Sequence, residues 1–100
     1  MATFKKNVEI LGSPGVARQL TAGATSASTQ LTTGVYRISM RAVGADVRFI
    51  IQEATGTADA STSHFIADGE RLDFAVPSYG YLCYIRDAST DGVLEVTELV

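Results

Sequence analysis

Few side chains in this sequence of 100 residues could take part in catalysis. His64 is the only histidine, so a hydrolase of the Ser-His-Asp type would have to use it as the base. The serines and aspartates that would complete such a triad occur throughout the chain, and no G-x-S-x-G elbow is present. The single cysteine, Cys83, lies in an apolar run between Tyr81 and Tyr84, where we expect a small buried hydrophobe rather than a nucleophile. The sequence therefore predicts that the protein is not an enzyme.

Metal ions and phosphate-bearing cofactors have equally weak signals. One histidine and one cysteine cannot form a structural zinc site within a single chain. The segment 12–15 (Gly-Ser-Pro-Gly) lacks the lysine and the following helix of a phosphate loop, and we expect it to be a turn. Four carboxylates could be imagined as calcium ligands, but their spacing matches no EF-hand loop. They are Asp59, Asp68, Glu70 and Asp73. We expect no metal and no cofactor.

The charge balance argues against nucleic acid as a partner. The formal net charge is −3, whereas binding to a phosphate backbone requires clustered lysine and arginine. Four arginines could form a basic strip, but acidic residues in the same segments are expected to pair with them across strands, giving a solvated sheet face or a subunit contact. The arginines are Arg37, Arg41, Arg48 and Arg71, and the acids are Asp46, Glu53, Glu70 and Asp73.

The composition also argues against a membrane protein. No run approaches the roughly 18 apolar residues of a membrane span, and the N-terminus lacks the pattern of a signal peptide. With 46% hydrophobic and 19% charged residues, the chain suits one soluble β-domain.

The elements that would position these side chains follow a period of two residues. From Val35 to Val43, alternate residues are apolar, which is typical of a strand with one buried face. Residues 44–46 (Gly-Ala-Asp) then form a tight turn, and the alternation resumes over 47–52. We expect a central hairpin, whose first strand points four residues inward: Tyr36, Ile38, Met40 and Ala42.

The other runs predict further short strands. The stretch 54–63 contains no apolar residue larger than alanine and reads as a long connection. Asp-Gly at 68–69 is a hairpin signal, and the nearly apolar run 81–87 predicts a strand covered on both faces. Further strands are expected at 25–31, 64–66, 70–76 and 93–99, with shorter candidates at 8–11 and 16–20.

Seven or eight short strands without a helix predict an all-β fold, an antiparallel β-sandwich or jelly roll. We expect residues 24–100 to form the sandwich domain. Residues 1–23 have no long apolar pattern. They are expected to be either an irregular N-terminal arm or an edge segment of the same sandwich.

The run SHFIADGERLDFAVPSYGYLCYIRDASTDGVLEVTEL, residues 63–99, contains a familiar order of features. A short Phe-Ile strand and a glycine turn precede a strand ending in Val-Pro. An apolar strand with Ile-Arg follows, and Thr-Asp-Gly leads into a final Leu-x-Val-Thr strand. TTGVYRIS, residues 32–39, adds a Gly-Val-Tyr-Arg entry into the first long strand. In these features, which cover about residues 25–99, the chain resembles the small head-decoration (cement) proteins of tailed bacteriophages.

The resemblance implies a role in the virion. Such proteins are often jelly-roll or sandwich domains that sit as trimers on the outer capsid surface, where major capsid subunits meet, and reinforce the shell against internal DNA pressure. It therefore implies a homotrimer, the major capsid protein of the same virus as the partner, and synthesis in the host cytoplasm before assembly on the virion. The family has no catalytic residues to carry over.

In this family the part that contacts the capsid is frequently an N-terminal extension, which implies a contact within residues 3–11. Phe4 would anchor it by burial, and Lys5 and Lys6 by attraction to an acidic capsid surface. Val8 and Ile10 complete the expected contact. For the two lysines, a solvated terminus is the alternative.

Two other functions stay open. One is a tail, fibre or adaptor component with the same sandwich. The other is a carbohydrate- or receptor-binding sandwich in which Tyr79, Tyr81 and Tyr84 stack on sugar rings. The alternation places Tyr84 inward, which counts against the second of these.

Overall fold

The computed structural model describes residues 14–78 and 80–100, and in this part the protein is all β. Within these residues eight strands are formed, and no helix is long and apolar enough to cross a membrane. The strands are β1 (Pro14–Ala22), β2 (Ala27–Gln30), β3 (Arg37–Val43), β4 (Val47–Gln52), β5 (His64–Ile66), β6 (Arg71–Ala75), β7 (Tyr81–Arg86) and β8 (Gly92–Leu99).

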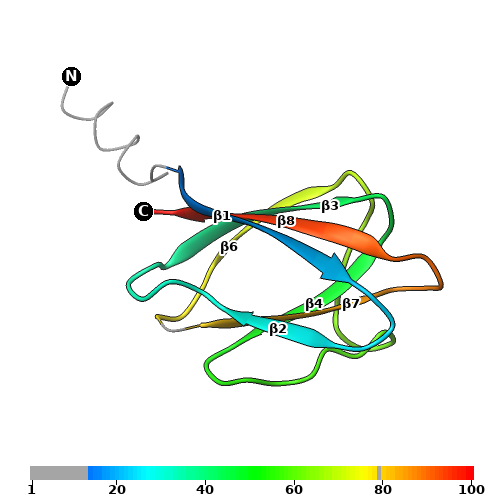
Figure 1. The fold of residues 1–100 in the computed structure, drawn as a ribbon. Coiled ribbons are helices and arrows are strands. Elements are labelled where there is room, and N and C mark those ends of the chain that lie inside the picture. Colours follow the sequence, from blue (N-terminus) through cyan, green and yellow to red (C-terminus); the bar gives the residue numbers. More distant parts are fainter. Residues whose placement is uncertain (1–13, 79) are drawn as a thin grey trace.

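The strands form two four-stranded antiparallel sheets that face each other (Figure 1). Sheet A has the order β1-β8-β3-β6, and sheet B has the order β2-β7-β4-β5. The chain can be described as one long antiparallel ribbon that turns back between β4 and β5 and is wound into a roll. The ribbon pairs β1 with β8, β2 with β7, β3 with β6 and β4 with β5. This is the eight-stranded jelly roll, so the predicted fold class is confirmed.

Both predicted hairpins are wrong in their pairing. β3 and β4 belong to different sheets, and so do β5 and β6. The turns themselves exist: Gly44 and Gly69 have φ angles of 91° and 84°, a region that favours glycine. A turn reverses the chain, but each flanking strand can bury its apolar face in either of two facing sheets. Among these eight strands, β4 and β5 are the only paired strands that follow each other directly in the chain. Every other pair joins strands that are separated by at least two others.

The core lies between the sheets and is built from alternate residues of each strand. Ile38, Met40 and Ala42 are fully buried, as their alternation predicted. Tyr36 is not: its side chain is 60% exposed, because β3 begins only at Arg37 and Tyr36 lies beyond the end of the strand. The same cluster includes Val47, Phe49, Ile66, Leu82, Tyr84, Leu94 and Val96 from the other strands.

The stretch 14–22 forms an edge strand rather than an arm. β1 pairs only with β8, and the register shifts between Pro14 and Ala17. Pro14 and Gly15 therefore lie in a strand and not in the predicted turn; proline is tolerated here because an edge strand leaves one side of its backbone unpaired. β1 therefore forms one edge of sheet A. The strand expected at 8–11 lies outside the described residues.

The connection 53–63 lies over the outer face of sheet B (Figure 1). The backbone N–H of Ala58 donates to Ser26 Oγ at 2.8 Å. Arg48, on the outer face of β4, donates to the carbonyl oxygen of Ser63 at 3.0 Å. These two hydrogen bonds hold the connection against the sheet.

Cys83 is buried beneath this connection. It alternates with the inward residues Leu82 and Tyr84, so it points to the outer face of β7, and yet it is fully buried. Cys83 and Ala58 are both buried but lie outside the main core cluster, which indicates a second small layer under the connection. β7 is therefore covered on both faces, as its nearly apolar sequence predicted.

This cover predicts the reactivity of Cys83. Ser26→Ala removes the acceptor of the Ala58 N–H, and a hydrogen bond worth about 1 kcal/mol changes the population of an open connection about fivefold. We expect Ellman's reagent to modify the folded Ser26→Ala variant about fivefold faster than the wild type. Thr25→Ala, at an exposed neighbouring position, is the control and should react at the wild-type rate. Equal rates for Ser26→Ala and the wild type would mean that the connection does not protect the thiol.

Candidate functional site

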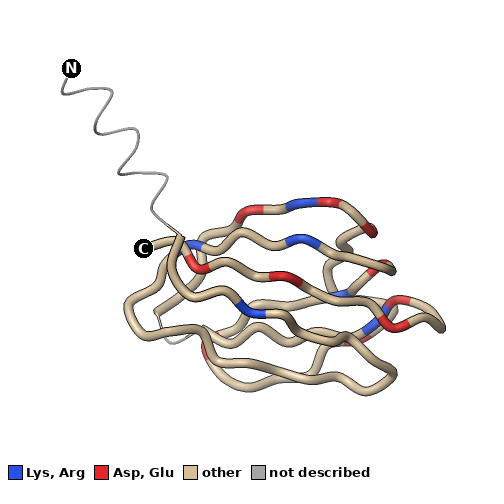
Figure 2. The backbone as a smooth tube through the Cα atoms, turned by 45° about the horizontal axis from the view of Figure 1, so that its top comes forward, with Lys and Arg blue, Asp and Glu red and all other residues tan. Residues whose placement is uncertain are grey.

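The strand register gives the sandwich two ends that differ in charge. One end carries the connections 23–26, 44–46, 67–70 and 87–91, which contain five acidic residues and no basic one. We refer to it as the acidic end. In Figure 2 acidic residues gather at this end, away from the marked termini. The acidic residues of these connections are Asp46, Asp68, Glu70, Asp87 and Asp91.

The opposite end, which we refer to as the neutral end, is formed where β1 and β3 begin and where β6 and β8 end. The connections 31–36 and 76–80 belong to it and contain no charged residue, whereas the connection 53–63, which leaves β4 at this end beside Tyr81, carries Glu53 and Asp59. The two ends therefore offer different surfaces to a partner: the acidic end carries five carboxylates, two of them paired with arginines, and the neutral end carries fewer charges.

Carboxylates near the turns are engaged by the backbone. Asp68 Oδ1 accepts a hydrogen bond from the N–H of Gly44 at 2.8 Å. Asp59 accepts from the N–H groups of Ser61 and Thr62 at 2.7 and 3.1 Å, and these bonds lower its pKa. No three His, Cys, Asp or Glu side chains converge as metal ligands in the part of the chain that the structure describes. The four carboxylates considered for calcium are thus not brought together.

The ion pairs differ from those predicted for the arginine strip. Arg48 binds Asp87 with an N–O distance of 2.7 Å. Arg41 lies opposite Glu95 on one side and Arg71 on the other, because the sheet partners of β3 come from distant parts of the chain. Within residues 14–78 and 80–100 the ion pairs are Arg18–Glu98, Arg48–Asp87 and Arg86–Asp91. The prediction that the four arginines pair with nearby acids is therefore wrong for these acids: Asp46, Glu53, Glu70 and Asp73.

The neutral end exposes three large apolar side chains, which we define as the apolar patch. Val16, Tyr36 and Val100 are 46%, 60% and 65% exposed. Tyr36 directly precedes β3 and Val100 directly follows β8, so the antiparallel register makes them neighbours. A Cβ on Gly15, beside Val16, would come within 3.1 Å of Val100 Cγ1, so β1 lies close to the same point. An exposed apolar cluster of this kind marks a candidate contact surface.

Behind the apolar patch lies a buried ion pair. Glu98 continues the inward alternation of Leu94 and Val96 on β8 and is fully buried. Its Oε2 accepts hydrogen bonds from Arg18 Nη2 at 3.1 Å and from the N–H of Thr32 at 2.8 Å. One carboxylate thereby joins β1, β8 and the connection between β2 and β3.

The environment of Glu98 sets its protonation. Burial acts to raise its pKa, but the hydrogen bonds from Thr32 and the guanidinium of Arg18 outweigh burial, so the pKa of Glu98 lies below its ordinary value. Because the folded-state pKa is the lower one, the carboxylate contributes stability above the unfolded pKa of about 4.3. That contribution is lost as the pH falls through the folded pKa.

We predict that Glu98→Gln lowers the free energy of unfolding at neutral pH by about 1–3 kcal/mol, because the bond to Arg18 loses its charge. In urea titrations, the difference from the wild type should shrink as the pH falls below about 4. Glu95→Gln is the matched control on the same strand, since Glu95 bonds only Gln19, at 3.4 Å, on the exposed outer face. A difference that stays constant down to low pH would mean that the Glu98 carboxylate is not what stabilises the fold.

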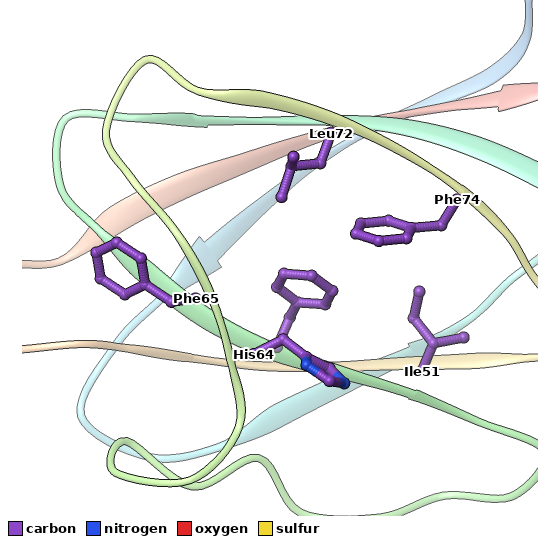
Figure 3. A pocket seen from close by; sticks show the side chains of 6 residues that line it. Ile51, His64, Phe65, Leu72 and Phe74 are labelled. Atoms are coloured by element: carbon purple, nitrogen blue, oxygen red, sulfur yellow. The ribbon is translucent and has the colours of Figure 1, made fainter.

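A groove opens between the two sheets along the edge strands β5 and β6 (Figure 3). It has a volume of about 310 Å³. The ring of Phe49 packs against His64 and Phe74, with centroid distances of 5.6 and 5.4 Å. We refer to this cavity as the aromatic groove; its lining residues are Phe49, Ile51, His64, Phe65, Leu72 and Phe74.

The aromatic groove is suited to binding rather than to catalysis. Among the described residues, His64 is the single polar side chain in its lining, and none of them adds a hydroxyl or carboxylate beside it. A triad needs a nucleophile and an orienting acid within hydrogen-bond reach of the base. The groove offers apolar and aromatic surface instead, with one imidazole at its border.

The residues expected to contact a partner are only partly described. Cys83 lies buried under the connection 53–63, as shown above. Tyr84 is 7% exposed, and burial raises its pKa, so its ring is not free to stack on a sugar. Tyr81 is half-buried. Tyr79 and the predicted capsid contact Phe4, Lys5, Lys6, Val8 and Ile10 lie outside the described residues.

Comparison with known proteins supports the fold. No family model and no curated protein matches the chain. A solved structure described as a de novo designed double-stranded β-helix aligns with a TM-score of 0.56, over 84% of this chain and 99% of that chain, at 14% identity. A double-stranded β-helix is a wound antiparallel ribbon, as is this jelly roll. At that identity the likeness shows the fold alone.

Proposed function

We propose that the protein is a structural component of a tailed-phage virion, a head-decoration protein that binds the outer capsid surface through its neutral end. The observation that carries the proposal is the contrast between the two ends of the sandwich. A protein that stands on a shell needs one end that can be dehydrated and another that stays in solvent. The neutral end meets the first requirement, and the acidic end meets the second.

The energetics of desolvation support this orientation. Burying the apolar patch removes apolar area from water, at roughly 25 cal/mol per Å². Tyr36, the largest of its three residues, is of a type enriched in protein interfaces. Burying the acidic end would dehydrate five carboxylates, of which only Asp87 and Asp91 pair with arginines, and a buried charge without a partner is strongly unfavourable.

The resemblance to decoration proteins supplies the partner and the assembly, namely the major capsid protein of the same virus and a homotrimer. The N-terminal segment joins the sandwich at the neutral end, where β1 begins at Pro14. The predicted contact residues Phe4, Lys5, Lys6, Val8 and Ile10 would thus reach the shell from the same end as the apolar patch. Three linked copies multiply a small interface without any new contact.

The assembly is tested by native mass spectrometry of the purified protein at micromolar concentration. We expect a trimer, because each sandwich offers only a small contact and avidity requires several linked copies. A strictly monomeric protein would contradict the proposed mode of binding.

The orientation is tested by co-sedimentation with heads assembled from the major capsid protein of the same virus. We predict that Tyr36→Ser weakens binding about tenfold or more, as expected when an interface aromatic is lost. Val43→Ser is the matched control: Val43 is 37% exposed and lies at the other end of β3, next to the acidic end. Equal effects of both variants, or none from either, would show that the neutral end is not the contact. Binding to purified tails instead of heads would favour a tail or adaptor component.

A further inference from the structure

The described surface offers little apolar area through which intact sandwiches could hold one another. Among the described residues, the exposed large hydrophobic side chains are the three of the apolar patch together with Val43 and Phe65, which lie on different sheets. The proposed function assigns the patch to the shell. The aromatic groove is concave, so a second copy would have to insert a protruding apolar side chain. A stable interface buries about 800 Å² on each partner around an apolar centre, which contact between the flanks would lack.

β1 is a long edge strand with few buried side chains. It pairs with β8 alone, and its residues from Pro14 to Ala17 are all exposed. Ala22 is fully buried, and Leu20 is partly buried against the core. An edge strand that contributes so little to the core can open locally while the rest of the domain stays folded.

The edge of β8 that β1 covers requires a particular replacement. Glu98 is fully buried on β8, and Arg18 of β1 supplies its cation at 3.1 Å. Without β1, Glu98 keeps the bond from the N–H of Thr32 but has no charged partner, which is strongly unfavourable for a buried carboxylate. The β1 strand of a second copy carries Arg18 at the same register position. Charge complementarity therefore favours that strand as the replacement.

The connection 23–26 can act as the hinge for β1. It crosses from sheet A to sheet B, and Ala24 and Thr25 within it are exposed. Opening costs the hydrogen bond from the Arg86 N–H to the Gly23 carbonyl, at 3.0 Å, whereas Ser26 can keep its bond from Ala58. Together the hinge and β1 reach about 43 Å when extended, about three times the width of a four-stranded sheet.

We propose that in the oligomer β1 of each copy leaves its own sandwich and pairs with β8 of the next copy, in the register that the two strands have within one chain. This inference rests on the proposed function and deepens it, because it identifies how the copies are linked. Exchange reuses contacts that one chain already makes, so it needs no new apolar interface. Passing the strand in one direction around three copies closes a ring.

Exchange also changes what the shell contact is made of. Val16 lies on β1, whereas Tyr36 precedes β3 and Val100 follows β8. In the exchanged form, each apolar patch combines Val16 of one copy with Tyr36 and Val100 of the next. Each Arg18–Glu98 pair likewise joins two copies. A copy can then leave the shell only by opening the sheets of its neighbours.

Disulfide trapping tests the exchange in the full-length protein carrying Cys83→Ala. Ala17 lies opposite Thr97, and opposed Cα atoms in antiparallel strands are about 4.5–5.5 Å apart, within the range of a disulfide. We expect the oxidised Ala17→Cys/Thr97→Cys protein to run as three joined chains on a denaturing gel without reductant. The matched control, Ser39→Cys/Thr97→Cys, joins β8 to its other neighbour β3 and should run as a single chain.

A second pair of variants guards against distortion of the strand by the first. Gln19→Cys/Glu95→Cys joins β1 to β8 at another position, and Arg41→Cys/Glu95→Cys is its control between β3 and β8. Single-chain bands from both β1–β8 pairs would overturn the exchange, whether the protein is an oligomer or a monomer.

Co-sedimentation of the same variants with heads separates the exchange from the proposed function. If the chains are joined through β1 and β8 but no heads are bound, the proposed function fails and the exchange stands. If heads are bound by protein that gives only single-chain bands, the exchange alone fails.

Discussion

β8 pairs along its length with two partners, β1 on one side and β3 on the other, and this double pairing closes the jelly roll. The last strand of the chain thereby lies between the first and the third. Its inward residues run from Leu94 and Val96 in the core to Glu98 at the neutral end. The bond from Arg18 to Glu98 joins positions 80 residues apart. Because sheet A consists of such distant pairings, loop closure must be completed before its contacts stabilise anything.

The local pattern predicted the buried faces of the strands but not their partners. Ile38, Met40 and Ala42 are buried as the alternation indicated. A strand in a sandwich buries one face whichever sheet it joins, so the alternation carries no information about pairing. This is why β3 and β4 were expected to pair although they lie in different sheets. Tyr36 was misplaced for a related reason, since a periodic pattern does not tell where the sheet ends.

The surface features were visible in the sequence only as fragments. A charged residue that continues the alternation of Leu94 and Val96 indicates that Glu98 needs a buried partner, but Arg18 comes from a strand far away in the chain. The acidic connections can each be read from the sequence, whereas only the topology brings the three of them to one end. The aromatic groove likewise depends on β5 and β6 being edges of different sheets, which no short-range signal contains.

The Arg18–Glu98 pair separates the core from the apolar patch. A buried ion pair is a poor source of stability compared with well-packed apolar residues, and here Glu98 Oε1 and Arg18 Nε are buried without a partner among the described residues. An apolar residue at this buried position would make the core continuous with Val16 and Tyr36, but it could not bond Arg18 or the N–H of Thr32. The carboxylate instead holds β1 and Thr32 in place by directed hydrogen bonds. The strands beneath the apolar patch are thereby tied together independently of any contact made on the patch.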